Sequence, residues 1–252
     1  MNNGFHVLIP ARLASTRLPN KPLVDLGGRS LVVRVLERAL AAGAAGVHVA
    51  TDSEQVARCV REAGGEVVMT GADHVSGTDR LVEAVGRLGL AADQVVVNLQ
   101  GDEPLMPVSA IRRVVELLAE DPGAHMATLW RPLEDQSQWR DPNVVKLVTD
   151  AGGRALYFSR APVPWPRGRA FRAGDGCRHV GLYAYRVSAL QAWPELPASH
   201  LEAVESLEQL RALAAGWRIA CAPSPEPVPP GIDTPEDLAR VRASHFNVEQ
   251  KL

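Results

Sequence analysis

Apolar segments alternate with helical patterns along the first half of the chain, and this alternation limits the fold more than any other feature. Short apolar runs typical of strands lie at residues 6–9, 47–51, 66–69 and 94–99. Amphipathic patterns typical of helices lie at residues 30–42, 54–63, 79–88 and 108–119. Strands separated by helices imply right-handed crossovers and a parallel sheet. We therefore expect an α/β fold, a mostly parallel twisted sheet flanked by helices.

The alternation loosens after about residue 125. Four further strand-like segments, joined by loops rich in Pro and Gly, lie at residues 126–130, 144–149, 155–158 and 180–185. This pattern predicts a smaller β-rich lobe at residues 126–219. We expect it to be inserted into an α/β domain formed by residues 1–125 and 220–252.

Other segments of the second half have simpler patterns. Residues 162–177 predict a surface loop, and residues 201–215 predict a helix. Residues 223–230 hold five prolines in eight positions, so this segment must be extended. A last helix is expected to begin near Thr234.

Composition excludes several classes of protein. The net charge of −2 over 252 residues gives no reason to expect nucleic acid or an anionic membrane as a partner. Cys59, Cys177 and Cys221 lie far apart, which fits a reducing compartment. No apolar run approaches the ~20 residues that cross a bilayer, and no signal peptide pattern is visible. We therefore expect a soluble cytoplasmic protein.

The segment LIPARLASTRLPNKP (8–22) carries three cations in a loop that follows the first strand: Arg12, Arg17 and Lys21. Such a loop lies where α/β sheets bind ligands. Arg offers a planar fork for phosphate oxygens and Lys a compact charge, so the loop suits a triphosphate. A solvated basic turn is the alternative interpretation.

Two aspartates are candidates for a metal site. Asp102 follows the apolar run VVVNL, so its carboxylate is expected at the carboxyl edge of the sheet. There it suits Mg²⁺, which takes one or two carboxylates together with phosphate oxygens; alternatively it caps its own turn. In GIDTPEDL (231–238), Thr234, Pro235 and Asp237 form a helix start, which leaves Asp233 free. From these residues alone Asp233 is only a loop residue.

The segment ADHVSGTD (72–79) also precedes a helix. Its backbone amides suit a nucleobase or a phosphate, although Ser76, Thr78 or Asp79 are equally suited to be a plain cap. Asp52 ends the second strand, and it is either a nucleotide contact or a cap for the helix that begins near Glu54.

Taken together, the blocks of this chain resemble sugar-activating nucleotidyltransferases. The similarity is greatest to the 3-deoxy-manno-octulosonate (Kdo) cytidylyltransferase family. It extends in family order through the loop at 8–22, VATD (49–52), ADHVSGTDRL (72–81), VNLQGDEPL (97–105), NVVKLV (143–148), ALYFSRAPVPW (155–165), RHVGLYAYR (178–186), LEQLR (207–211) and GIDTPEDL (231–238). One departure is Asn20, where Gly is common in the family.

The resemblance implies a Rossmann-like nucleotidyltransferase fold and the reaction CTP + Kdo → CMP-Kdo + diphosphate, for lipopolysaccharide biosynthesis. It implies Mg²⁺ as cofactor on Asp102 and Asp233, with residues 72–79 framing the cytosine. The implied partners are CTP, an eight-carbon sugar acid and a second copy of the chain in a homodimer. Residues 126–219 would bind the sugar and form the dimer, and the other domain would bind the nucleotide.

The resemblance also implies roles for individual residues. The implied catalytic residues are Arg12, Arg17, Lys21, Asp102 and Asp233. The implied nucleotide-binding residues are Pro10, Ala11, Arg12, Arg17, Lys21, Asp52, Asp73, Ser76, Gly77, Gln100 and Gly101. The implied sugar-binding residues are Arg160, His179, Tyr183, Tyr185, Glu208 and Gln209. Arg160 and His179 suit the sugar carboxylate, and Glu208 and Gln209 suit its hydroxyls.

Three alternatives remain at this point. In the first, the chain activates a related sugar acid of the 8-amino-Kdo or sialate type, and in the second it uses another nucleotide. In the third, it binds a sugar nucleotide without catalysis. The last alternative predicts loss of Lys21 or of a metal carboxylate, and all of these are present. A Rossmann dehydrogenase is excluded because no GxGxxG follows the first strand.

Overall fold

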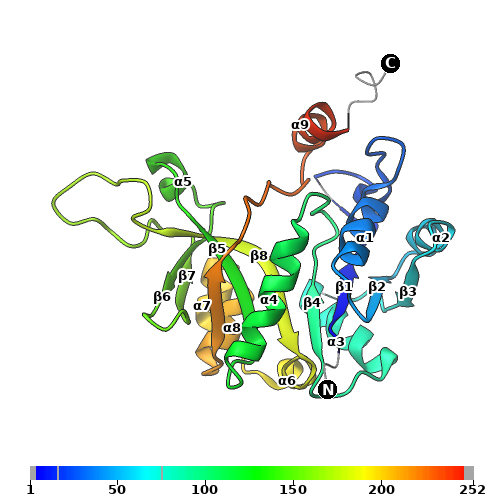
Figure 1. The fold of residues 1–252 in the computed structure, drawn as a ribbon, viewed down its shortest axis with the longest axis horizontal. Coiled ribbons are helices and arrows are strands. Elements are labelled where there is room, and N and C mark those ends of the chain that lie inside the picture. Colours follow the sequence, from blue (N-terminus) through cyan, green and yellow to red (C-terminus); the bar gives the residue numbers. More distant parts are fainter. Residues whose placement is uncertain (1–3, 16, 75, 247–252) are drawn as a thin grey trace.

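The computed structural model describes residues 4–15, 17–74 and 76–246, and nine strands in this part of the chain form one mixed sheet (Figure 1). The strands are β1 (His6–Pro10), β2 (Gly46–Thr51), β3 (Glu66–Met69), β4 (Val95–Asn98), β5 (Met126–Pro132), β6 (Lys146–Thr149), β7 (Ala155–Ser159), β8 (Cys177–Arg186) and β9 (Ile219–Pro223). The main path of the sheet is β3-β2-β1-β4-β8-β5-β9, and β6 joins it beside β8 with β7 as its hairpin partner. Strands β3, β2, β1 and β4 are parallel, as the alternation predicts.

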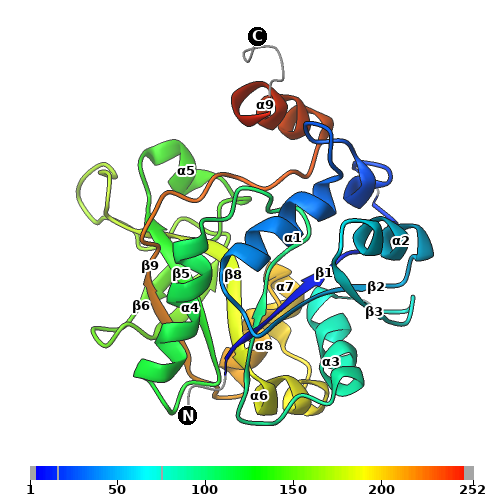
Figure 2. The same ribbon diagram turned by 45° about the vertical axis from the view of Figure 1, so that its right-hand side comes forward.

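Helices cover both faces of this sheet (Figure 2). They are α1 (Leu31–Ala41), α2 (Glu54–Glu62), α3 (Gly77–Leu88), α4 (Val108–Glu120), α5 (Gln136–Arg140), α6 (Val187–Ala192), α7 (His200–Glu205), α8 (Gln209–Ala214) and α9 (Pro235–His245), with 3₁₀ helices at Lys21–Leu23 and Trp193–Glu195. On β1, Val7 and Ile9 pack in the core that includes α1, α2 and α4, whereas Leu8 packs in the core that includes α3, α6 and α8. Successive strand residues point to opposite faces, so a strand buried on both faces must be apolar throughout.

The second half of the chain extends the same sheet rather than starting a new one. Strand β8 is antiparallel to both β4 and β5, and β9 is parallel to β5. The sheet therefore continues across the boundaries expected near residues 125 and 220. The division of the chain into two domains stays a prediction.

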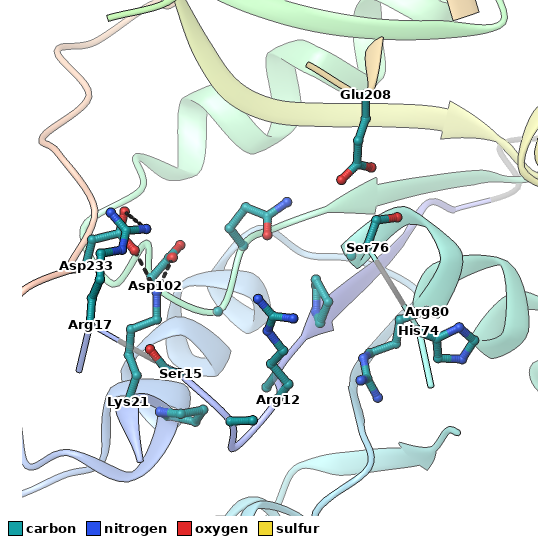
Figure 3. Close-up of a pocket in the computed structure, with 17 residues that line it drawn as sticks. Arg12, Ser15, Arg17, Lys21, His74, Ser76, Arg80, Asp102, Glu208 and Asp233 are labelled. Atoms are coloured by element: carbon teal, nitrogen blue, oxygen red, sulfur yellow. Dashed lines mark hydrogen bonds and ion pairs between the residues drawn. The ribbon is translucent and has the colours of Figure 1, made fainter. Parts of the chain in front are cut away.

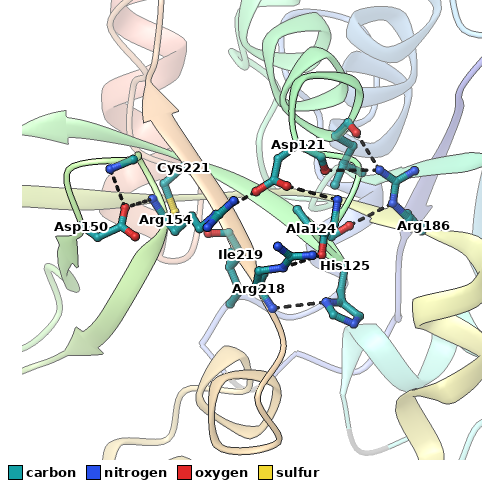
Figure 4. Close-up of polar contacts among 12 residues, drawn as sticks. Asp121, Ala124, His125, Asp150, Arg154, Arg186, Arg218, Ile219 and Cys221 are labelled. Atoms are coloured by element: carbon teal, nitrogen blue, oxygen red, sulfur yellow. Dashed lines mark hydrogen bonds and ion pairs between the residues drawn. The ribbon is translucent and has the colours of Figure 1, made fainter.

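A polar network ties these elements together at the end of α4 (Figure 4). The guanidinium of Arg186, at the end of β8, donates to the carbonyl oxygens of Leu118 (2.7 Å) and Ala124 (2.9 Å). Arg154 donates to the Asp121 carboxylate at 2.9 Å, and Arg218, just before β9, donates to the Gly123 carbonyl at 2.8 Å. The Leu118 carbonyl is one of those that a helix leaves free in its last turn, and the other contacts fix residues 121–124, which follow α4, to β8 and to the residues just before β7 and β9.

One predicted helix is wrong. Residues 201–215 form two short helices, α7 and α8, because Ser206 takes a left-handed conformation (φ 51°) that ends α7. Strand β9 and the helices α5 and α6 have no counterpart in the sequence prediction. Residues 162–176 contain no helix or strand, as expected for a loop.

The last helix is predicted correctly. Thr234 accepts a hydrogen bond from the Asp237 amide, and Asp237 bonds back to the Thr234 amide, which completes a capping box. Arg242 of α9 donates to the Asp25 carbonyl oxygen, so α9 lies over the loop before α1, as Figure 1 shows. The proline-rich segment at 224–234 thus returns the chain to the first strands. Within the described residues no helix has the length and apolar character that a membrane span requires.

Candidate active site

A cavity of about 330 Å³ lies at the carboxyl ends of β1 and β4 (Figure 3). Its walls come from the loop after β1, the start of α3, the exit of β4 and the segment before α9. The residues that line it are Pro10, Ala11, Arg12, Ala14, Ser15, Arg17, Lys21, Pro22, His74, Ser76, Gly77, Arg80, Gln100, Gly101, Asp102, Glu208 and Asp233. This is where an open α/β sheet binds ligands.

Lys21 joins the two candidate metal ligands at one end of this cavity. Its Nζ lies 2.6 Å from Asp102 Oδ2 and 2.9 Å from Asp233 Oδ1. Burial opposes the charge on Lys21, but Asp102 and Asp233 outweigh it and raise the pKa of the ammonium. Asn20, which precedes Lys21, has a left-handed conformation (φ 54°), which explains why Gly suits this position.

Backbone contacts bring the two aspartates together from distant parts of the chain. The Ile232 amide donates to the Asp102 carbonyl oxygen at 2.9 Å. At Gly231 a Cβ would lie 3.1 Å from that same oxygen, so the close approach favours glycine. At Gly101 a Cβ would lie only 2.8 Å from the Pro10 carbonyl oxygen.

Arg17 is the second loop cation that contacts this pair of carboxylates. Arg17 Nη2 lies 3.1 Å from Asp233 Oδ2, and the Arg17 side chain is 65% exposed. Arg12 forms no ion pair within the described residues, and Figure 3 shows it pointing into the cavity. Thr16, in the same loop, lies outside the described residues.

Glu103 follows Asp102 and was not identified from the sequence. Burial, together with the charges of Asp102 and Asp233, raises the pKa of its carboxyl to about 8. Glu103 is therefore mostly protonated at pH 7, and it adds little negative charge beside the two aspartates.

The opposite end of the cavity is built around the start of α3. Ser76 caps this helix by accepting from the Asp79 amide at 3.1 Å. The buried Arg80 guanidinium donates to the Thr70 hydroxyl, to the Gly71 carbonyl oxygen (3.2 Å) and to Asp52 Oδ2 (3.3 Å). This wall is therefore held rigidly by hydrogen bonds. Val75 lies outside the described residues.

A second cavity, of about 200 Å³, adjoins the first. It is lined by Thr78, Asn98, Gln100, Tyr183, Tyr185, Ser206, Leu207, Glu208 and Gln209. Gln100 and Glu208 line both cavities, so two ligands would meet beside them. Glu208 Oε2 accepts from the Thr78 hydroxyl at 2.7 Å, and burial raises the pKa of the Glu208 carboxyl.

Comparison with known proteins identifies the fold and the family. The model of the family described as Cytidylyltransferase matches residues 6–219. The 3-deoxy-manno-octulosonate cytidylyltransferase of Xanthomonas euvesicatoria pv. vesicatoria (strain 85-10) is 53% identical over 247 residues, which cover 94% of this chain and 95% of that protein. The protein of the same name from Saccharophagus degradans is 50% identical, over 95% of this chain and 98% of that protein.

A solved structure described as CMP:2-keto-3-deoxy-manno-octonic acid synthetase complexed with CTP has a TM-score of 0.87 and 42% identity, and it covers 95% of this chain and 97% of its own. This chain belongs to the 3-deoxy-manno-octulosonate cytidylyltransferase family. A cytidylyltransferase of Leptospira borgpetersenii, with a TM-score of 0.57 and 18% identity, shares the fold. The Rossmann-like nucleotidyltransferase fold and the family expected from the sequence are confirmed.

For this family member, most of the predicted nucleotide residues lie together in the first cavity. Asp52 and Asp73 do not occur among the described residues that line it; Asp52 pairs instead with Arg80. Ser15 and Arg80 line the cavity but were not predicted, whereas His74, which also lines it, belongs to the segment 72–79 expected to frame the cytosine. No local pattern distinguishes Ser15 and Arg80, because their position depends on how the loop and α3 pack.

The second cavity is lined by four of the residues predicted to bind the sugar, Tyr183, Tyr185, Glu208 and Gln209, and their contact with a sugar stays a prediction. His179 does not supply the expected positive charge, because burial lowers the pKa of its ring to about 3. The neutral ring bonds to the Thr128 hydroxyl at 2.9 Å and packs against Phe158. This correction follows from the tertiary packing of β8, which the sequence does not reveal.

Arg160 also differs from its predicted setting. Its guanidinium donates to the carbonyl oxygens of Glu205 (2.6 Å), Pro142 (2.9 Å) and Ser206 (3.3 Å). Among the described residues that line the two cavities, neither Arg160 nor His179 occurs. A direct contact between Arg160 and a sugar stays a prediction.

Proposed function

We propose that this chain transfers the cytidylyl group of CTP to 3-deoxy-manno-octulosonate, giving CMP-Kdo and diphosphate for lipopolysaccharide biosynthesis. The observation that carries the proposal is the arrangement of two adjoining cavities beside a cluster of loop cations and paired carboxylates. The first cavity suits the nucleotide, and the second, lined with hydroxyl and carboxyl groups, suits a polyhydroxylated acid.

The reaction needs no covalent enzyme intermediate. The anomeric hydroxyl oxygen of the sugar acid bonds to the α-phosphorus of CTP, the bond from that phosphorus to the bridging oxygen breaks, and the hydroxyl proton is released. Arg12, Arg17 and Lys21 would balance the charge of the triphosphate and of the leaving diphosphate. The protein then contributes chiefly position and charge stabilisation, as in other phosphoryl transfers.

The residues present fit a divalent cation. Asp102 and Asp233 both lie within hydrogen-bond distance of a single nitrogen, so both carboxylates reach one cation. No group of three or more His, Cys, Asp or Glu side chains suited to a metal occurs in the described part of the chain, so substrate oxygens would have to complete the coordination. When bound there, Mg²⁺ would supply charge neutralisation and polarisation of phosphate oxygens.

The protein is inferred to act in the cytoplasm as a homodimer. Exposed apolar side chains support the dimer: Leu156 on β7 is 58% exposed, and Leu201 and Val204 on α7 are 42% and 67% exposed. These two elements adjoin, because Ser159 of β7 donates to Glu205 of α7 at 2.7 Å. Light scattering tests the dimer: a mass near that of one 27.1 kDa chain at micromolar concentration would refute it.

Diphosphate release tests the proposed reaction. CTP, UTP, ATP and GTP are each assayed against Kdo, 8-amino-Kdo and a sialic acid, with MgCl₂ and with EDTA. We expect release only when CTP, a sugar acid and the divalent cation are all present, with Kdo the preferred acid. Equal rates with 8-amino-Kdo or sialate would change the assignment of the acceptor, whereas no release with any acid would refute the enzymatic function.

A further inference from the structure

One wall of the second cavity is a short stretch of main chain between two helices. Ser206, Leu207, Glu208 and Gln209 are consecutive, and all four line this cavity. They span the left-handed turn at Ser206 and the start of α8. A non-glycine residue is disfavoured in the left-handed region, so the conformation of Ser206 must be stabilised by contacts with neighbouring residues.

Glu205, which ends α7, holds this wall through its side chain. Its Oε1 accepts from the hydroxyl of Ser159 at 2.7 Å and from that of Tyr157 at 3.4 Å. Its Oε2 accepts from the backbone N–H of Arg160 at 2.8 Å. Burial opposes the charge of Glu205, but these hydrogen bonds prevail and keep the pKa of the carboxyl below its usual range. The end of α7 is thus fixed to β7.

The side chain of Arg160 also bonds to this part of the chain, through backbone carbonyl oxygens. Its Nε donates to the carbonyl oxygen of Glu205, and its Nη2 donates to that of Ser206. Its Nη1 donates to the Pro142 carbonyl oxygen in the turn before β6. The side chain of each residue therefore bonds to the backbone of the other, and the turn at Ser206 lies between these contacts.

We propose that Glu205 is a positioning residue for the acceptor sugar acid, because with Arg160 it fixes residues 206–209 in the conformation that forms the second cavity. This inference rests on the proposed function of that cavity as the acceptor site. Glu205 itself does not occur among the described residues that line the cavity, so it acts through Ser206, Leu207, Glu208 and Gln209.

The contacts require a side chain with two hydrogen-bonding atoms at position 205. A carboxylate offers two acceptor oxygens, and here both are used by N–H or O–H donors. A Gln side chain keeps one oxygen for the Arg160 N–H, and its NH₂ group can donate to the Ser159 hydroxyl, because a hydroxyl also accepts hydrogen bonds. Glu205→Met therefore removes the contacts on both sides with a side chain of similar length, whereas Glu205→Gln keeps them.

The test compares Glu205→Met with Glu205→Gln and with the control Glu195→Met, which removes the same charge from an exposed side chain just after α6. Initial rates are measured while CTP and Kdo are varied separately. For Glu205→Met we expect the KM for Kdo to rise roughly tenfold or more, as for the loss of charged hydrogen bonds. We expect kcat and the KM for CTP to change less than about twofold by the same reasoning. Glu205→Gln should recover most of the loss, and Glu195→Met should match the unmodified protein.

A second readout does not depend on turnover. Hydrogen exchange of the peptide that contains residues 200–210 should be faster in Glu205→Met than in the unmodified protein or in Glu195→Met. Unchanged exchange, or a KM for Kdo that does not rise, would overturn the proposal. Equal losses for both substrates with a lowered melting temperature would also overturn it. If the unmodified protein used no sugar acid at all, the proposed function would fail instead, and the exchange measurement would still decide whether Glu205 orders the wall.

Discussion

Replacing Lys21 with Met should convert the site into one that depends on a divalent cation for its stability. In the unmodified protein one ammonium contacts both Asp102 and Asp233. Without it, the two carboxylates face each other, and among the described residues Arg17 is the cation that remains paired with Asp233. Two like charges about 5 Å apart repel by roughly 3 kcal/mol at an effective dielectric of 20.

Solvent reduces this repulsion, because the Asp233 side chain is 44% exposed and that of Asp102 is 27% exposed. A destabilisation of about 1–2 kcal/mol remains after screening. For a chain of this size it corresponds to a loss of roughly 2–8 °C in melting temperature.

Thermal unfolding in EDTA and across a MgCl₂ titration measures both effects. Lys21→Met should melt below the unmodified protein in EDTA, and MgCl₂ should stabilise the variant more than it stabilises the unmodified protein. Arg29→Met is the control, because it breaks an ion pair with Glu37 at the surface, where both side chains are over a third exposed. An equal response to MgCl₂ in all three proteins would refute the reasoning, as would an unchanged melting temperature of Lys21→Met in EDTA.

Three further predictions follow from the same geometry and from the burial of His179. Asp102→Asn and Asp233→Asn should each abolish most of kcat, and the double variant should lose little more, since groups that act as a unit are non-additive; additive losses measured in the diphosphate assay would separate their roles. Lys21→Ala should lower kcat/KM for CTP by the equivalent of about 2–5 kcal/mol, the range for one partner of a desolvated charge pair, and an unchanged value would make the loop a plain basic turn. The pKa of His179 is about 3 in the folded protein, below the 6.5 of the unfolded chain, so the unfolded state binds the extra proton and stability falls as the pH drops below 6.5. Urea unfolding should therefore show a loss of about 2 kcal/mol from His179 between pH 7 and pH 5, in addition to smaller losses from His6 and His125, whose pKa burial also lowers; His179→Gln should reduce the total loss, and a pH dependence equal to that of the unmodified protein would contradict the role of His179.

Local patterns were sufficient for the first half of the fold and for the last helix. The strand β1 and the helix α1 have uninterrupted apolar patterns, and the capping box at Thr234 and Asp237 is complete within four residues. In such segments the intrinsic propensity of the residues, their hydrophobic pattern and the tertiary packing all favour the same secondary structure. The prediction of one helix at 201–215 is wrong because Glu205 and Arg160 stabilise a turn at Ser206. Contacts between these residues, which are distant in the sequence, produce no periodic pattern of apolar residues that could have indicated the turn.

Predictions for the site are limited in the same way, because they fail where a residue's position or charge depends on contacts with distant parts of the chain. The positions of Lys21 and Asp102 near one edge of the sheet are predictable, because they lie in the loops that follow the recognisable strands β1 and β4; their roles in the reaction stay predictions. Asp233 had no local signal for function, and it reaches the site because the backbone of Ile232 pairs with that of Asp102. His179 was misjudged because its charge depends on burial among Phe158 and Thr128, which belong to other strands.

The rate of diphosphate release from CTP with Kdo, measured for the unmodified protein and for Asp233→Asn in the presence of MgCl₂, tests the proposed reaction most directly. We predict that release by the unmodified protein requires both substrates, that it is slower when UTP replaces CTP, and that Asp233→Asn loses most of the rate. Release from UTP as fast as from CTP, or a nearly normal rate in Asp233→Asn, would contradict the proposal.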